Sequence, residues 1–337
     1  MSEVVTRPHV QNFIDWSADK PEVLVLTADL TNSCEVGQWR DTYPDRYFSL
    51  GMAEQNMVGF AAGLAREGFE PWLHTFAVFL YRRPLDQLQM SVAYPNLPVR
   101  LVGFLPGLMT PGGVTHQAID DLAVMRAIPN MTILETGDAT EVETVLDVAH
   151  AIDGPVYIRM LRGEVPRLFD PADAMRFGVA RDLTPEVTGP RVTLISSGIC
   201  TEEALRAVPA LTAAGVTVKH LHVNTIKPFD DPQVLDAIRS ASDGVITMEN
   251  HLRVGGLGSA VAELIAEHGL GTRLVRIGID DTYCHGASLS YLQREYGIDA
   301  TALCRAVGEL CQVSVDESAV LDARQIQVHS AARAEAL

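Results

Sequence analysis

Short apolar runs alternate along the chain with longer segments in which apolar residues recur every three or four positions. Val23–Leu26 and Val99–Phe104 are runs of the first kind, and Ala53–Arg66 is a segment of the second kind. Continuous apolar strands separated by helices predict a parallel sheet that is covered on both faces. The alternation resumes at Val192–Ser196 and continues to about residue 310. We therefore expect an α/β fold built from two tandem doubly wound domains.

A proline-rich stretch separates the two alternating halves. Residues 163–190 contain Pro166, Pro171, Pro185 and Pro190 and show no long periodic pattern, which is typical of a linker. A length of 337 residues also suggests two domains. The expected division is a first domain over 1–162, a linker over 163–190, a second domain over 191–318 and a tail over 319–337.

The charge balance is acidic and limits the partners. The 26 Lys and Arg stand against 43 Asp and Glu, a formal net charge of −17, whereas nucleic acid and anionic membranes are bound by clustered basic residues. Hydrophobic residues make up 47%, which excludes a largely disordered chain. No apolar run approaches the roughly 20 residues that span a bilayer, and no secretory leader is visible, so we expect a cytoplasmic protein. The five cysteines form no C-x-x-C pair and are expected to be reduced thiols.

Several common site motifs are missing. The chain has no P-loop, no G-x-G-x-x-G after a strand and no H-E-x-x-H, so neither a nucleotide loop nor a metal site is predicted in it. Gly255-Gly256-Leu257-Gly258 precedes a helical segment and could offer backbone N–H groups to an anion. We favour the alternative that this is a tight turn that lets a helix pack on the sheet.

Four stretches in the first half carry candidate chemistry. They are SLGMAEQNM (49–57), HTFAVF (74–79), GGVTHQAIDDLAVMRAIPNM (112–131) and GPVYIRMLRG (154–163). Each is weak by itself. Glu54 could be a carboxylate that complements a helix N-terminus, Phe76 and Phe79 could be core residues, and His116 could be a surface residue at the start of a helix.

Together and in this order, the stretches resemble the pyrimidine-binding domain of transketolase. Ala28-Asp29-Leu30 followed by Ser33 resembles that family's first strand end. Residues 226–230 (IKPFD), 249–251 (ENH) and 255–260 (GGLGSA) resemble its C-terminal domain. The resemblance covers about residues 5–310 and implies a thiamine-diphosphate-binding pyrimidine domain followed by a transketolase C-terminal-like domain.

The family's diphosphate-binding motif is absent. The chain contains no Gly-Asp-Gly, and Gly137-Asp138-Ala139 lies in the wrong domain to replace it. The chain thus resembles the back half of a split transketolase. This implies a partner, an N-terminal-half subunit that carries the diphosphate-binding domain and its Mg²⁺. It also implies thiamine diphosphate shared between the subunits and a heterotetramer made of two such pairs.

The resemblance assigns roles to individual residues. Glu54 occupies the position of the glutamate that hydrogen-bonds the cofactor's pyrimidine ring, and Phe79, with Phe76 beside it, is placed to stack on that ring. Asp29 is also expected to be a cofactor-binding residue. His116 matches a histidine that contacts the donor ketose and moves a proton. The expected substrate-binding residues, for the phosphate end of the sugar, are Arg162, Ser33 and Arg7.

Three departures from the family pattern bear on the substrate. Gly112-Gly113-Val114 replaces a segment that contains an aspartate, Phe104 stands where the family has a phosphate-binding histidine, and the loop Leu105–Pro111 is apolar. From these departures we expect a less polar substrate mouth and a non-standard substrate: an unusual ketose phosphate, a branched sugar or a modified acceptor.

The expected activity is transfer of a two-carbon ketol unit from a ketose, or ketose phosphate, to an aldose acceptor. Two alternatives remain at this point: the beta subunit of a 2-oxo-acid dehydrogenase, which has the same two-domain order, and a non-catalytic partner subunit that keeps only the fold. The segment THQAIDDLAVMRAIPNM favours transketolase over the first, and the presence of Glu54, Phe79 and His116 argues against the second.

Overall fold

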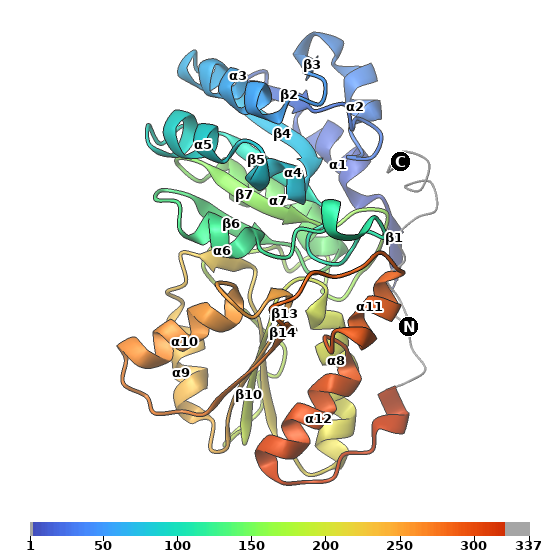
Figure 1. The fold of residues 1–337 in the computed structure, drawn as a ribbon, viewed down its shortest axis with the longest axis vertical. Helices are drawn as coiled ribbons and strands as arrows, with labels where there is room; N and C mark the ends of the chain where they lie inside the picture. Colours follow the sequence, from blue (N-terminus) through green and yellow to red (C-terminus); the bar gives the residue numbers. More distant parts are fainter. Residues whose placement is uncertain (1–2, 321–337) are drawn as a thin grey trace.

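Two α/β units, each built on its own sheet, are stacked along the long axis of the molecule (Figure 1). The computed structural model describes residues 3–320, so the tail expected over 319–337 lies almost wholly outside the described residues. Within the described part, no helix is both long enough and apolar enough to cross a membrane. The predicted fold class, two tandem α/β domains, is confirmed.

The first unit is built on a seven-stranded sheet. In sheet order its strands are β12 (Thr225–Lys227), β6 (Thr132–Glu135), β7 (Val156–Met160), β5 (Arg100–Phe104), β4 (Glu70–Phe76), β2 (Val23–Thr27) and β3 (Tyr47–Ser49). All of them run parallel except β12, which comes from the second half of the chain and pairs antiparallel with β6. The second half thus supplies one edge of the first sheet.

Helices cover both faces of this sheet (Figure 1). One face carries α1 (Pro8–Trp16), α2 (Gly37–Thr42), the 3₁₀ helix η1 (Pro44–Arg46) and α7 (Ala139–His150). The other carries α3 (Glu54–Arg66), α4 (Ala77–Arg82), α5 (Leu85–Gln87), the π-helix η2 (Leu88–Ala93), the 3₁₀ helix η3 (Gly113–Thr115) and α6 (Asp121–Arg126).

The second unit repeats the plan on a five-stranded sheet. In order, its strands are β14 (Leu274–Ile279), β13 (Gly244–Leu252), β10 (Val192–Ser196), β11 (Val218–His222) and β9 (Arg181–Asp182), and only β9 is antiparallel. Its helices are α8 (Cys200–Ala213), α9 (Pro232–Ser240), α10 (Leu257–Glu267), α11 (Leu289–Glu295), α12 (Ala300–Cys311) and the 3₁₀ helix η4 (Glu317–Val320). A separate ribbon pairs β1 (Val4–Thr6) with β8 (Glu164–Pro166).

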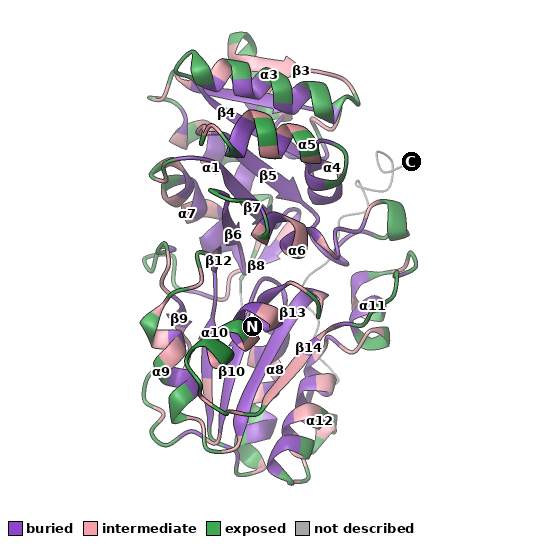
Figure 2. Ribbon diagram, turned by 60° about the vertical axis from the view of Figure 1, so that its left-hand side comes forward, coloured by how far each residue is buried: buried purple, intermediate pink, exposed green. Residues whose placement is uncertain are grey.

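The sequence pattern explains the packing. Every residue of β2, β5 and β7 is buried, as expected for strands covered on both faces, and α3 buries an apolar stripe that includes Met57, Val58 and Ala61 (Figure 2). An aromatic cluster fills the space between α1 and the first sheet, where Phe13 lies against Trp39 and Trp72 at ring-centroid distances of 5.8 and 5.5 Å.

A buried ionic cluster joins the two units. Arg159 on β7 is fully buried, donates from Nε to Asp121 at 2.9 Å and pairs with Glu135. Its Nη2 also donates to the carbonyl of Asn250 on β13 at 3.0 Å, so one guanidinium connects both sheets. Buried charges are tolerated only when they are paired and hydrogen-bonded in this way.

Two local expectations differ from the structure. A helix was expected from His116, but His116 follows the short η3 turn and the helix begins only at Asp121. The carbonyl of Ala118 accepts from the N–H of Gly107 at 2.8 Å, so the segment between His116 and Asp121 is bridged to the preceding loop instead of continuing as a helix. The stretch 163–190, expected to be a linker, contains β8 and β9, and each of these strands joins a sheet.

Candidate active site

The carboxyl ends of the parallel strands β2, β4, β5 and β7 meet at one edge of the first sheet, where ligands bind in open α/β folds. Phe76 is the last residue of β4, Ser33 lies in the loop after β2, and Arg162 lies just after β7. The topology therefore brings predicted residues from distant parts of the sequence to the same edge.

Glu54 is the first residue of α3 and is only 3% exposed. No side chain caps this helix at Ala53, so a carboxylate in the first turn complements the helix dipole. Its Oε1 accepts a hydrogen bond at 2.5 Å from Nη1 of Arg83, whose side chain is 48% exposed. The predicted catalytic carboxylate is thus buried, with a cation on its accessible side.

Phe76, Phe79 and His116 form an aromatic group beside Glu54. The rings of Phe76 and Phe79 are stacked at a centroid distance of 5.9 Å and an angle of 22°. His116 meets the edge of Phe79 at 5.6 Å and of Phe76 at 6.4 Å. The guanidinium carbon of Arg83 lies over Phe79, 4.2 Å from its centroid, so Glu54, Phe79 and Arg83 are in contact.

His116 is half-buried, and its environment favours the neutral ring. Burial lowers its pKa, the backbone of Gly112 opposes that shift, and the charge of Arg83 adds to it. Its Nδ1 is hydrogen-bonded to Thr115 Oγ1 at 2.8 Å. A Cβ at Gly112 would lie 2.9 Å from Cγ of His116, so in this arrangement the family's aspartate has no room at position 112.

The segment that carries His116 is held on one side by Arg82. This guanidinium donates to the carbonyl groups of Val114 and Gln117 at 3.3 and 3.2 Å, and to Asp120 at 3.0 Å. The hydroxyl of Tyr81 also donates to Asp120, and burial raises the pKa of that tyrosine.

The second unit holds the same segment from the other side. Asn250 on β13 is buried, accepts from the N–H of Leu108 at 3.0 Å and donates to the carbonyl of Pro106 at 3.0 Å. A Cβ on Gly113 would lie 3.1 Å from the backbone nitrogen of Gly286, so the two backbones touch. We conclude that the position of His116 depends on both units.

The apolar loop does not line the substrate mouth, contrary to the expectation from the sequence. The side chains of Leu105, Leu108, Met109 and Thr110 are buried by the chain itself. Phe104 is also buried and lies against the His9 ring at 5.6 Å, inside the first unit. The apolar character of the loop therefore reflects packing, and it says nothing of the sugar.

Of the predicted anion-binding residues, Arg162 and Ser33 lie next to this group, and Arg7 is linked to it only through its backbone bond to Gly163. The guanidinium carbon of Arg162 is 5.9 Å from the centroid of Phe76, and Arg162 donates to the carbonyl of Ser33. Arg7 precedes α1 and is exposed, and its backbone N–H donates to Gly163 at 2.6 Å. Asp29 follows β2 in a left-handed conformation, φ 61°, and is exposed. None of these positions contradicts the expected roles.

The sequence reasoning missed three residues that shape the site: Arg83, Arg82 and Asn250. The adjacent Arg82-Arg83 pair, three and four residues after Phe79, was a visible signal, because Phe79 and Arg83 are four residues apart and share one helix face. Asn250 lies in the ENH segment (249–251) described above, but nothing in that segment indicated its contacts with Leu108 and Pro106.

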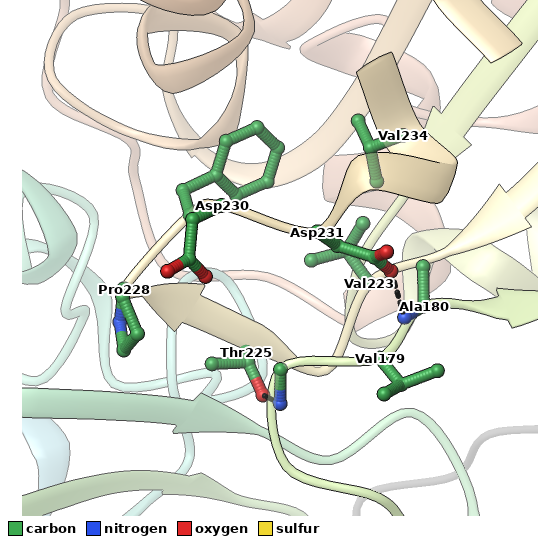
Figure 3. A pocket seen from close by; sticks show the side chains of 10 residues that line it. Val179, Ala180, Val223, Thr225, Pro228, Asp230, Asp231 and Val234 are labelled. Carbon is green, nitrogen blue, oxygen red and sulfur yellow. Dashed lines mark hydrogen bonds between the residues drawn. The ribbon is translucent and has the colours of Figure 1, made fainter. Parts of the chain in front are cut away.

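Two other candidate features do not form ligand sites. The N–H groups of Leu257 and Gly258 at the start of α10 donate to the carboxylate of Glu249 at 2.7 and 2.8 Å, so the glycine-rich turn is filled from within, as favoured above. A cavity of about 10 Å³ beside β12 has room for one water at most (Figure 3). In it, Asp231 accepts from the backbone N–H of Ala180 at 2.6 Å.

Comparison with known families agrees with this arrangement. Residues 10–167 match the transketolase pyrimidine-binding domain, and residues 183–303 match the transketolase C-terminal domain. The chain belongs to the transketolase family.

Its relatives include separately encoded C-terminal halves. The chain is 36% identical over 307 residues to a 6-deoxy-6-sulfo-D-fructose transketolase subunit of Clostridium sp. (strain MSTE9), covering 90% of this chain and 93% of that protein. It is 34% identical over 300 residues to a putative transketolase C-terminal section of Methanocaldococcus jannaschii, covering 89% and 93%.

A solved structure resembles the whole chain. It is described as a split gene transketolase in an inactive beta4 tetramer, and it is 34% identical with a TM-score of 0.81. The match covers 91% of this chain and 97% of that one. This chain is thus similar to split transketolase subunits along nearly all of its length.

Proposed function

We propose that the chain is the catalytic subunit of a thiamine-diphosphate-dependent split transketolase that moves a two-carbon ketol unit from a ketose to an aldose. The observation that carries this proposal is the grouping of buried Glu54, stacked Phe76 and Phe79, and His116 at one sheet edge. The pyrimidine-binding family model supports the cofactor.

The residues present fit the pyrimidine ring of this cofactor. The planar guanidinium of Arg83 is accommodated between the carboxylate of Glu54 and the face of Phe79, so a flat, nitrogen-bearing group can lie there. When bound, the cofactor would supply the carbon nucleophile that carries the two-carbon unit. Glu54 would hydrogen-bond its ring nitrogen, Phe79 and Phe76 would orient the ring, and Asp29 would lie on the cofactor side.

His116 would contact the sugar. With its pKa lowered by burial, the ring is neutral near pH 7, so one nitrogen accepts and the other donates a hydrogen bond. Such a ring can hold substrate oxygens and move a proton between them.

Arg162, with Arg7 and Ser33, would bind a terminal anionic group of the sugar. Arg162 is next to the stacked pair, and a guanidinium suits phosphate or sulfonate oxygens. One relative is named for 6-deoxy-6-sulfo-D-fructose, a sugar with an anionic end. Gly112, where the family has an aspartate, supports a sugar outside the standard pentose phosphates.

A partner subunit completes the site in this proposal. The chain contains no Gly-Asp-Gly, so the diphosphate and Mg²⁺ would be held by an N-terminal-half subunit, in a heterotetramer of two pairs. The similar beta4 tetramer is described as inactive, which supports this need. Met52, just before α3, is 80% exposed, and Phe60 on α3 is also exposed.

The test is to purify the chain with the partner that it captures in its own cells and to assay two-carbon transfer. We expect turnover with thiamine diphosphate, Mg²⁺, a ketose and an aldose, and none from the chain alone. Ketose phosphates and sulfonates in one panel would identify the anionic end. Full turnover by the isolated chain, or dependence on a 2-oxo acid and a lipoyl carrier, would contradict the proposal.

A further inference from the structure

Arg83 fills the space that the proposed pyrimidine ring would need. Its guanidinium donates to Glu54 at 2.5 Å and lies 4.2 Å from the centroid of Phe79. Its charge also acts on His116. One exposed side chain therefore contacts or influences the three groups on which the proposed chemistry depends.

The local backbone places Arg83 there. Phe79 and Arg83 are one helical turn apart, with Arg83 directly after α4, so their side chains share a face. The side chain of Gln55, the residue after Glu54, donates to the carbonyl of Arg83 at 3.1 Å and holds the start of α3 beside it. Two elements, α4 and the start of α3, thus place the backbone of Arg83 beside Glu54 and Phe79.

We propose that Arg83 is a resident competitor of the cofactor's pyrimidine ring: it occupies Glu54 and the face of Phe79 in the unloaded subunit and must leave both before the ring can bind. This inference rests on the proposed function. A guanidinium and an aminopyrimidine are both flat and both offer nitrogen to the carboxylate, so they compete for the same two surfaces.

The contrast with Arg82 shows that Arg83 can leave. Arg82 donates to Tyr81, Asp120 and two backbone carbonyls. Within residues 3–320, the structure gives the guanidinium of Arg83 one ion-pair partner, Glu54, and its side chain is 48% exposed. Arg83 can turn into solvent without breaking any other hydrogen bond of its side chain.

The competition is expected to appear in the cofactor's equilibrium affinity. Rotamer changes of exposed side chains take picoseconds to nanoseconds, so Arg83 does not limit the rate of binding. When only a fraction of the molecules have an open site, the apparent dissociation constant rises by the inverse of that fraction. A side chain that closes the site about nine-tenths of the time would weaken binding about tenfold.

The experiment compares Arg83→Met, Arg83→Lys and wild type in the complex with the natural partner, using calorimetric titration with thiamine diphosphate and Mg²⁺. We expect Arg83→Met to bind the cofactor about tenfold more tightly, about 1.4 kcal/mol. Arg83→Lys keeps the charge without the planar fork and is expected to lie between the two. Arg40→Met, on α2, removes an exposed arginine that is paired with Asp41 and should leave affinity unchanged.

A second readout separates competition from a structural role. Loss of the ion pair with Glu54 should lower the unfolding midpoint of the cofactor-free complex while the cofactor binds more tightly. If the role of Arg83 were only structural, Arg83→Met would lower both the unfolding midpoint and the affinity for the cofactor. Unchanged or weaker binding by Arg83→Met would overturn the inference, and weaker binding restored by Arg83→Lys would make Arg83 a cofactor ligand. If the wild-type complex binds no thiamine diphosphate, the proposed function fails instead.

Discussion

At the edge of the first sheet, Glu54 and the Phe79 ring meet the half-exposed side chain of Arg83. At the corresponding edge of the second sheet, Glu249, Asn250 and His251 are bound to backbone groups of the chain itself. Glu54 begins α3, which follows β3, whereas Glu249, Asn250 and His251 belong to the last part of β13.

The difference lies in what those polar groups bind. Glu249 accepts two backbone N–H groups of α10, so its hydrogen bonds stabilise the fold. The cation paired with Glu54 is Arg83, whose side chain is half-exposed, and a ligand can displace it. A carboxylate at the start of a helix is therefore a site only when its partner can leave, and the other edge serves as a joint between units.

The largest expected effect comes from Glu54→Gln. Turnover of the assembled complex should fall by about 10² to 10⁴, because an amide cannot exchange a proton with the ring nitrogen. Steady-state kinetics and an unfolding curve on the same sample test this, and the unfolding midpoint should fall only as far as loss of the ion pair with Arg83 lowers it. Glu249→Gln is the matched control and should retain turnover. Near-normal rates for Glu54→Gln would remove this residue from the mechanism.

The next largest effect is expected at the ionic joint between the units, formed by Arg159 with Asp121 and Glu135. Arg159→Met should lower the free energy of unfolding by about 3–5 kcal/mol, since it leaves Asp121 and Glu135 buried without their cation. Urea unfolding of the variant and of wild type measures this loss of stability. For comparison, Arg305→Met breaks a pair with Glu317 at the surface and should cost less than about 1 kcal/mol. Equal effects of the two substitutions would contradict the importance of the joint.

Asn250→Ala tests whether the second edge supports the first. It leaves Leu108 N–H and Pro106 C=O unpaired, which should cost about 1–3 kcal/mol of stability. Because this loop leads to His116, kcat/KM should fall as well. Thr193→Val breaks a buried hydrogen bond to Ala237 in the second unit and should lower stability alone. If Thr193→Val lowers kcat/KM as much as Asn250→Ala does, Asn250 does not support the His116 segment.

The last effect, which develops gradually with pH, is expected at His251 in the joint. Burial lowers the pKa of His251 to about 4, and its Nε2 accepts from the N–H of Leu122. Between pH 6.5 and about 4 the unfolded chain binds this proton and the folded chain does not, so stability is lost as the pH falls. The contribution is about 1.4 kcal/mol per pH unit. His251→Gln should lose stability less steeply in this window; parallel curves would show that the histidine does not titrate.

Periodicity predicted the fold because strands buried on both faces and amphipathic helices leave direct patterns in the sequence. The motif order correctly indicated the family, and the glycine-rich turn at 255–258 was correctly interpreted as packing. Glu54, Phe79 and His116 were brought together as expected, although their chemical roles remain predictions.

The rest depended on contacts that leave no periodic signal. Asn250 holds a loop 142 residues away in the sequence, and nothing in either segment indicates this pairing. The same contact explains why the apolar loop was misinterpreted: apolar residues in a loop indicate burial, and only the structure shows what buries them. A helix was expected at His116 because the sequence does not show that Ala118, two residues later, pairs with Gly107.

The strand β12 has a consequence for synthesis on the ribosome. The edge of β6 remains unpaired until residues 225–227 have been made, long after the other strands of the first sheet. An exposed strand edge invites pairing with other chains, and domains fold as the chain emerges. A nascent chain that ends at the proline-rich stretch would therefore carry Glu54 and Phe79 without the second unit's contacts and with an open, aggregation-prone edge. Any truncation at 163–190 would make that transient state permanent.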